Sequence, residues 1–568
     1  MTGEGAAWQG FYSTLFFVHV YNTFTLIHAA LILNMKLTTV WLLFVILGAG
    51  VVHSRLEGAP EGWYETARAS SDERISVTFA IKQTNVEWLQ EKLKAVSYPD
   101  SPDYTNYMNF DEIAEYVHGR PESVRAVLES LASVDVPETA VDFTLGRDFA
   151  VVHMPVVAAE QLFSTDFYHY QHKDYPELKT VTSASYKLPE SLIGHVDFVS
   201  GVSSFPKPVS RPVKRKPMDN IDLLGTTPVT IARDYNTSGY VSTNTGNSQS
   251  IAAFLRQYYD PTDLSKFQTH YKLPVKKIAR VVGKNVPDDP GAEANLDVQY
   301  ISATGRGVST WFVSISTYSN GKQEDFLSWI VGQVNTTDSP WVHSASYGDV
   351  EKSIDLDYIQ RVDNEFVKFG VSGRTVLFAS GDSGVACKGF EEKYTPNWPA
   401  SSPYVTAVGG TTSLTKVWSA GGGGFSNVFA MPDYQKQAVE AYLNSGEAPS
   451  TTKFNKSGRA YPDVSAFATD FAIVDDGMIT PVDGTSCSAP TFAGIVSSLN
   501  DVRLNKGQKT LGFLNPLLYQ TLMGQGFFDI TEGSNGNGFA CKGFEAIKGW
   551  DPASGWGSPN FGVLQTLV

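Results

Sequence analysis

A serine precedes an apolar segment in the stretch Gly484-Thr-Ser486-Cys-Ser-Ala-Pro490. We expect residues 489–499 to form a helix, so this serine lies close to its start. There a backbone N–H has no partner inside the helix, and the positive end of the helix dipole could face a developing oxyanion. Gly484 would let a substrate approach closely, and we expect Pro490 in the first turn, where no N–H is needed. Ser486 is therefore a candidate nucleophile, and the alternative is a plain helix N-cap.

A serine nucleophile needs a base, which is usually histidine. After residue 200 the only histidines are His270 and His343, and neither lies in a His-Gly-Thr sequence. A histidine would also already be protonated in acid and could not accept a further proton. The sequence therefore disfavours a Ser-His-Asp triad.

Two carboxylates could take the place of that histidine. Glu293 and Asp297 lie four residues apart in a stretch, 291–300, that we expect to be helical, so they share one helix face. If they were buried together, the two groups would share a proton and the pKa of one would rise. A carboxylate with a pKa of about 4 to 5 is a suitable general base in acid. The alternative is an ordinary solvated acidic face.

A third acid follows an apolar strand, in Phe378-Ala-Ser-Gly-Asp382-Ser-Gly384. The turn would place Asp382 at the carboxyl end of a sheet strand, which is a common position for site residues. If it were protonated, an aspartic acid could donate a hydrogen bond to a developing oxyanion, and low pH favours that form. The alternative is an aspartate that only forms the turn.

Together these segments resemble the sedolisin family of serine-carboxyl peptidases, in particular its lysosomal and fungal secreted tripeptidyl peptidases. The resemblance covers about 220–568. It rests on Gly484 to Pro490, on the Glu293 and Asp297 pair, on Ser380 to Gly384, and on Ser346-Tyr-Gly-Asp349, Pro399-Ala-Ser-Ser-Pro-Tyr404, Gly422-Gly-Gly-Phe425-Ser-Asn427, Gly458-Arg-Ala-Tyr-Pro-Asp-Val464 and Gly549-Trp-Asp-Pro552. It implies that Ser486 is the nucleophile, Glu293 the general base and later acid, Asp297 the residue that orients Glu293, and Asp382 an oxyanion-hole donor.

The resemblance also implies an α/β fold. It consists of a subtilisin-like catalytic domain with a doubly wound parallel sheet, preceded by an α+β activation prodomain. The sequence pattern also favours this fold, because apolar runs typical of buried strands, at 375–379 and 405–408, alternate with helical stretches at 326–334 and 355–369. One structural Ca²⁺ is expected near the carboxyl end, with oxygen ligands as this ion prefers. Its implied ligands are Asp529, Ile530, Ile547, Gly549 and Asp551.

The chain has three cysteines, which permit one disulfide and one leftover thiol. The resemblance implies a Cys387–Cys541 bridge. Cys487 follows the candidate nucleophile and is expected to be a buried free thiol.

Residues 1–54 contain two apolar runs and differ from the rest. A start at Met35 would give a secretory signal over 35–54, and the alternative is a pair of membrane helices. Residues 55–205 contain expected strands at 75–81 and 149–154 and expected helices at 85–96 and 110–117, and they resemble the family's activation domain. A basic, proline-rich linker, 206–219, offers a processing site at Lys214-Arg215 or is simply a connector. The catalytic domain would be 220–568.

The net charge of −15 argues against a nucleic-acid partner, and no membrane partner is expected. Glycosylation sequons begin at Asn236, Asn335 and Asn455. The sequence thus predicts a secreted acid peptidase that removes tripeptides from free amino termini, acts on peptide and protein substrates and is inhibited by its own prodomain. It would work in an acidic extracellular setting or in a lysosome- or vacuole-like compartment. The alternatives are an acid endopeptidase on the same scaffold and an inactive or membrane-anchored relative.

Overall fold

The computed structural model describes residues 54–55, 58–176, 178–205, 213–214, 225–315, 325–387, 393–536 and 541–568. The chain divides into two units, Met1–Arg55 and Leu56–Val568. Of the first unit only β1 (Ser54–Arg55) is described. The expected signal segment and most of the linker lie outside the described residues. Within the described residues no helix is both long and apolar enough to cross a bilayer.

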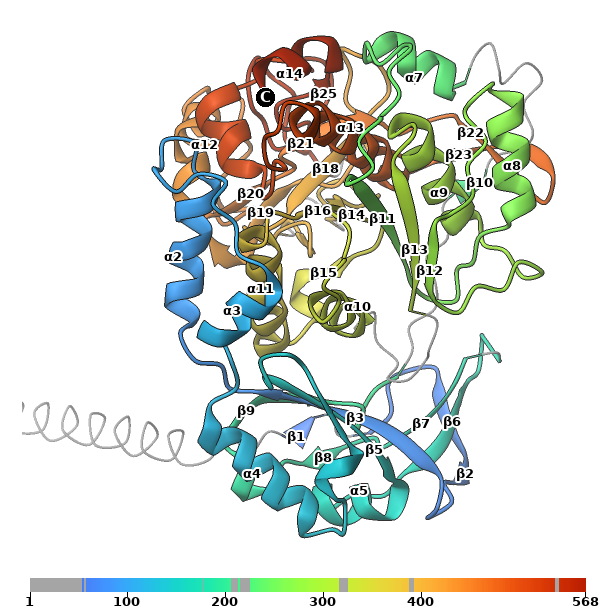
Figure 1. Ribbon diagram of the computed structural model, residues 1–568, viewed down its shortest axis with the longest axis vertical. Helices are drawn as coiled ribbons and strands as arrows, with labels where there is room; N and C mark the ends of the chain where they lie inside the picture. The colour runs from blue at the N-terminus through green and yellow to red at the C-terminus, as the bar shows by residue number, and fades with distance from the viewer. Residues whose placement is uncertain are drawn as a thin grey trace, which may run out of the picture. The chain divides into compact units, whose positions relative to one another are not determined.

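A seven-stranded sheet forms the centre of the larger unit, and its neighbouring strands all run parallel (Figure 1). In spatial order the strands are β12 (Arg280–Gly283), β13 (Ser309–Ser314), β11 (Ser248–Ala253), β14 (Val342–Ala345), β16 (Thr375–Ala379), β18 (Thr406–Thr411) and β21 (Val464–Phe467). Every residue of β16 and β18 is buried, as a parallel sheet covered on both faces requires. The expected α/β fold is confirmed.

Helices cover both faces of this sheet. Figure 1 shows α9 (Ala292–Thr304) and α13 (Thr485–Asn505) on one side and α10 (Asp325–Val334) and α11 (Leu356–Val371) on the other. The first pair is buried almost all round, as expected for helices between a sheet and an outer layer. The expected helices at 326–334 and 355–369 correspond to α10 and α11.

One sequence expectation about α13 is wrong. The helix begins at Thr485 instead of near residue 489, so Pro490 is its sixth residue and not part of its first turn. A proline there removes the N–H that would bond to the carbonyl four residues earlier, which belongs to Ser486. The nucleophile candidate therefore lies inside the first turn with an unusually free carbonyl.

Residues 58–205 build a smaller region on a four-stranded antiparallel sheet with its own apolar core. The expected strands correspond to β3 (Arg74–Ile81) and β5 (Phe149–Pro155), and the expected helices to α2 (Val86–Ser97) and α3 (Phe110–Tyr116). The sequence did not identify β2 (Trp63–Arg68), β4 (Val141–Phe143), β6 (Tyr168–His172), β7 (Lys179–Thr182), β8 (Tyr186–Lys187), β9 (Val196–Ser200), α4 (Pro121–Ala132) and α5 (Val156–Phe163).

The remaining elements are short or peripheral. They are β10 (Val213–Lys214), β15 (Asp349–Val350), β17 (Asn397–Trp398), β19 (Gly424–Ala430), β20 (Gly458–Tyr461), β22 (Phe471–Asp475), β23 (Met478–Asp483), β24 (Phe527–Phe528), β25 (Ser558–Pro559), α7 (Pro228–Asp234), α8 (Pro261–His270), α12 (Lys436–Leu443) and α14 (Phe561–Leu567). Of these, β23 matters most for the site because it leads directly into α13.

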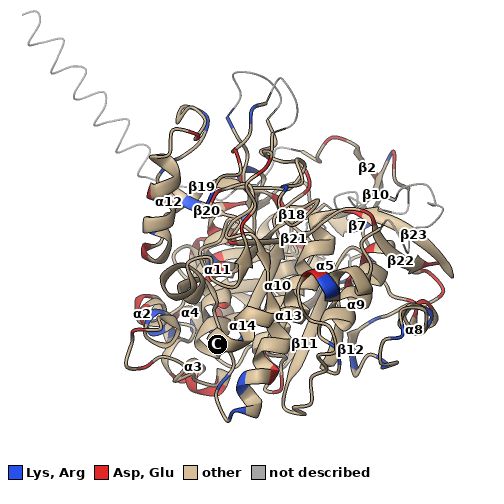
Figure 2. Ribbon diagram, turned by 90° about the horizontal axis from the view of Figure 1, so that it is seen from above, with Lys and Arg blue, Asp and Glu red and all other residues tan. Residues whose placement is uncertain are grey.

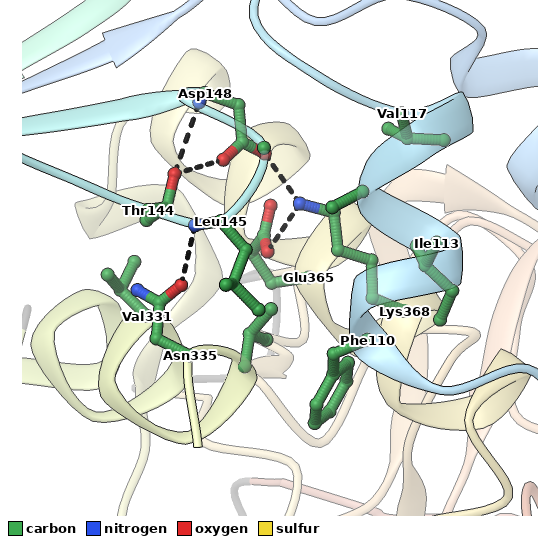
Figure 3. Close-up of a pocket in the computed structure, with 13 residues that line it drawn as sticks. Phe110, Ile113, Val117, Thr144, Leu145, Asp148, Val331, Asn335, Glu365 and Lys368 are labelled. Carbon is green, nitrogen blue, oxygen red and sulfur yellow. Dashed lines mark hydrogen bonds and ion pairs between the residues drawn. The ribbon is translucent and has the colours of Figure 1, made fainter. Parts of the chain in front are cut away.

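A buried charged cluster joins the smaller region to α11 (Figure 3). Asp148 accepts hydrogen bonds from Lys368 over 2.5 Å and from Arg361 over 3.2 Å. Both of these cationic side chains also form ion pairs with Glu365. Burial alone would raise the pKa of Asp148, but the two cations outweigh it and hold that pKa well below its ordinary value. Removing one partner of such a cluster typically costs about 3–5 kcal/mol, because it leaves a buried charge uncompensated.

Elsewhere in the described residues, Lys and Arg are interspersed with Asp and Glu (Figure 2). Pairs such as Arg280 with Asp338 and Lys94 with Glu91 are exposed. Exposed pairs each contribute less than about 1 kcal/mol. Among the described residues, the ion pairs between the two regions run through Arg361 and Lys368 of this cluster.

Candidate active site

Ser486 is the second residue of α13, and its side chain is buried. At this position its N–H has no carbonyl partner inside the helix. The preceding residue, Gly484, has a φ of 155°, and a Cβ there would lie 3.0 Å from Asp382 Oδ2. Glycine thus permits the close approach of the Asp382 turn to the start of the helix.

The Asp382 turn follows the carboxyl end of β16, where the sequence predicted it. The N–H and the hydroxyl of Thr485 donate to Asp382 Oδ1 over 2.8 Å and 2.7 Å. This leaves Oδ2 on the side of Gly484 and the nucleophile candidate. Asp382 lies at the exposed rim of the site, yet the protein atoms packed around its carboxyl raise its pKa above the ordinary value. A carboxyl that keeps its proton in this position can act as a hydrogen-bond donor.

Glu293 and Asp297 lie one turn apart on α9 and are 5% and 0% exposed, so they do not form a solvated acidic face. Burial raises the pKa of Glu293, and the nearby charge of Asp382 adds to the rise, whereas hydrogen bonding from Ser486 and Ser346 opposes it. Burial and the Glu293 charge raise the pKa of Asp297 well above its ordinary value.

One oxygen of each carboxyl, Glu293 Oε1 and Asp297 Oδ2, is buried without a donor. A single proton shared between the carboxyls would satisfy both oxygens. The pair would then carry one negative charge, and Glu293 could accept a proton from the Ser486 hydroxyl beside it.

The structure therefore brings Ser486, Glu293, Asp297 and Asp382 into one site. Sequence reasoning missed two of its polar neighbours, Thr485 and Ser346, although both lie inside the quoted motifs. Thr485 ties the Asp382 turn to α13, and Ser346 donates to Asp297 Oδ1 over 2.7 Å. The pocket shown in Figure 3 is a separate feature, lined by residues of the smaller region together with α10 and α11.

Neither histidine after residue 200 takes the place of a catalytic base. His343 is fully buried in β14, where Nδ1 lies 2.8 Å from the Ser250 hydroxyl and its ring packs against Phe369. Burial lowers the pKa of His343 to about 3, so it remains neutral in the core. His270 ends α8 on an exposed surface. The acid beside Ser486 is Glu293, whose pKa the serine hydroxyl lowers.

Of the five expected calcium ligands, Asp529 lies beside the segment that carries Ile547, Gly549 and Asp551. The Gly549 N–H donates to Asp529 Oδ2, and the Ile547 N–H donates to Asp551 Oδ2, each over 3.0 Å. Asp551 is fully buried, and its described hydrogen-bond donors are uncharged. Asp529 and Asp551 offer carboxyl oxygens, the ligand type that a hard cation such as Ca²⁺ prefers. No group of three or more His, Cys, Asp or Glu side chains suited to a metal occurs among the described residues.

The cysteines are arranged as the resemblance implied. Cys387 and Cys541 form a disulfide, with their Cα atoms 6.0 Å apart, and Cys487 is a buried free thiol. The bridge connects the segment after the Asp382 turn to the segment before the Ile547 loop. It restrains both segments, because a cross-link limits how far they can separate.

Comparisons of the sequence with known families and proteins agree with this organisation. A model of the pro-kumamolisin activation domain matches residues 61–205, and a model of the subtilase family matches 310–522. Tripeptidyl-peptidase 1 from dog and from human are each 40% identical over 539 residues, which is 90% of this chain and 94% of theirs. A solved structure of Pseudomonas sedolisin, a serine-carboxyl proteinase complexed with pseudo-iodotyrostatin, matches with a TM-score of 0.49 at 23% identity. That match covers 60% of this chain and 97% of the other.

Proposed function

The chain belongs to the sedolisin family and is a serine-type peptidase, and we propose that it removes tripeptides from free amino termini under acidic conditions. The proposal rests mainly on one observation. The buried Glu293 carboxyl interacts directly with the Ser486 hydroxyl, and no histidine lies between them. The tripeptidyl specificity is supported by relatives named for that activity.

In the proposed reaction, Ser486 Oγ attacks the scissile carbonyl and Glu293 takes the hydroxyl proton. Asp297 holds Glu293 in place and shares its charge. The Ser486 N–H and the protonated Asp382 donate to the oxyanion. Glu293 then returns its proton to the leaving amine, which breaks the peptide bond and leaves the tripeptide as an acyl group on Ser486. Water, activated by Glu293, hydrolyses that ester and restores the serine.

The test of specificity compares two reporter substrates with the processed protein at about pH 4. One is a tripeptide with a free amine and the other is the same tripeptide with its amine blocked. Release from the free form alone is expected, because a tripeptidyl peptidase binds the charged amine. Equal release from both would replace the proposal with its alternative, an acid endopeptidase on the same scaffold.

We also propose that residues 55–205 form an activation prodomain that inhibits the enzyme in cis, and that the linker 206–219 is cut near Lys214-Arg215 to leave 220–568 as the mature enzyme. In support, β10 pairs with β23, with Val213 opposite Asp483 and Lys214 opposite Val482, directly before Gly484. The buried Asp148 cluster supports tight docking. Since the pKa of Asp148 is depressed, this contact would be lost only when the pH falls below the ordinary aspartate range. Mild acid alone would leave it intact.

A structural Ca²⁺ is proposed at Asp529 and Asp551, completed by the carbonyl oxygens of Ile530, Ile547 and Gly549. The bound ion would tie together segments of the carboxyl-terminal region and stabilise the native state. A chelator is expected to lower Tm by about 3–5 °C, because a site filled at about 100 times Kd contributes about 2.7 kcal/mol to a catalytic region of about 350 residues. Differential scanning fluorimetry with and without added Ca²⁺ measures this. The Asp551→Asn variant is the control and should not respond to Ca²⁺, and an identical Tm for the unaltered protein with and without the ion would contradict the proposal.

We propose secretion into an acidic extracellular setting or a lysosome- or vacuole-like compartment, with N-linked glycans. In support, Asn236, Asn335 and Asn455 are all exposed. They differ in their side-chain contacts. The amide nitrogens of Asn236 and Asn455 donate to Asn560 and to the Ser426 carbonyl, whereas Asn335 uses its oxygen to accept from the Leu145 N–H.

A further inference from the structure

Ser346 follows the carboxyl end of β14 and contacts three groups of the site. Its hydroxyl donates to Asp297 Oδ1 over 2.7 Å and lies 3.4 Å from the backbone carbonyl oxygen of Ser486. The same hydroxyl also lies close enough to Glu293 to oppose the rise of its pKa. The residue is buried, so water competes little for these contacts.

Two features of the site explain why a hydroxyl is needed there. In a regular helix the Ser486 carbonyl would accept from the N–H four residues later, but that residue is Pro490. The Ser346 hydroxyl lies on this side, 3.4 Å from the Ser486 carbonyl oxygen, while its proton is directed at Asp297 over 2.7 Å. Because Ser346 also occupies Asp297 Oδ1, the other oxygen, Oδ2, is left for the proton shared with Glu293 Oε1.

We propose that Ser346 is a positioning residue of the peptidase reaction, which fixes Asp297 against Glu293 and links this pair to the backbone of Ser486. The inference rests on the proposed function, since it assigns Ser346 to the Glu293 and Asp297 carboxyls that act as the general base in that reaction. The titratable groups that act on the pair are Asp382, Tyr347 and Cys487, and none of them is a cation. Ser346 is therefore one of the few groups that stabilise the negative charge of the pair.

The test is the pH dependence of kcat and KM for Ser346→Ala. We expect kcat to fall about 10- to 100-fold with KM within about twofold, because a hydrogen bond to a charged group contributes about 1.5–3 kcal/mol. The acid limb of the kcat/KM profile should also move to higher pH, since hydrogen bonding from Ser346 lowers the pKa of both carboxyls. A purely structural role would not move that limb.

The matched control is Ser344→Ala. Ser344 lies two residues earlier, in β14, and its hydroxyl is buried without a partner, so its loss should leave kcat and the pH profile unchanged. Ser346→Thr keeps the hydroxyl and should keep the acid limb of the unaltered enzyme. If Ser346→Ala does not fold, Ser346→Cys is measured instead, because it fills the space but donates weakly.

An unchanged kcat and acid limb in folded Ser346→Ala or Ser346→Cys would overturn the inference. Failure of the proposed function would look different. The unaltered enzyme would then lack acid peptidase activity, or Glu293→Gln would retain it.

Discussion

Replacing Ser486 by alanine is expected to lower kcat at least about 10⁴-fold, because a serine peptidase loses its acyl-enzyme route when the nucleophile is removed. The side chain is buried at the start of α13, and only one hydroxyl is deleted, so the fold should persist. Steady-state hydrolysis of the free tripeptide reporter measures the loss, and Tm checks the fold.

A matched serine lies on the same helix. The hydroxyl of Ser497 is buried and has no partner, so Ser497→Ala should keep both activity and Tm. A loss of less than tenfold in folded Ser486→Ala would mean that another residue is the nucleophile. Cys487 cannot easily take over, because burial raises the pKa of its thiol well above the ordinary value and keeps it protonated.

The Glu293→Gln variant is expected to lower kcat about 10³-fold or more, with a much smaller change in KM. Glutamine has the same shape but cannot accept the Ser486 proton, and general-base catalysis contributes about 10²–10⁴-fold. Loss of the shared charge with Asp297 adds to this effect. Steady-state kinetics of the folded variant, with KM separated from kcat, measures both parts.

His270→Ala is the control for this variant, because His270 is the exposed histidine of the two that follow residue 200. It should keep the activity of the unaltered enzyme. If Glu293→Gln remained active and His270→Ala did not, the carboxyl base would be the wrong assignment.

Much of the catalytic region could be predicted from the sequence. The predicted strand 375–379 has the same bounds as β16. A short apolar run that ends at a glycine turn is typical of a buried strand. The spacing of Glu293 and Asp297 placed both acids on one helix face. It could not tell whether that face is buried, because the apolar residues that cover it come from distant segments. The family resemblance, and not the spacing, identified the pair as functional.

The limits of sequence reasoning have physical causes. A glycine before a helix does not show which residue begins the helix. The sequence therefore predicted Pro490 in the first turn of α13, whereas the helix begins at Thr485. Ser346 has no local pattern of its own, and its role depends on two segments, around 297 and 486, that only the fold brings together. In the smaller region, β6 pairs antiparallel with β2, which lies about a hundred residues earlier, so local sequence does not reveal the pairing. Four elements of this region were predicted and the others were not.

The central claim is that protonated Asp382 and the Glu293–Asp297 pair replace a histidine. The pH dependence of kcat/KM for the processed enzyme, from pH 3 to pH 8, tests it most directly. Because the pKa of Asp382 is raised, its proton is retained in mild acid and lost as the pH climbs through that value. The predicted result is therefore a maximum in the acid range and a fall toward neutral pH. An activity that rises steadily from pH 4 to pH 8, as a histidine base would give, would contradict the account.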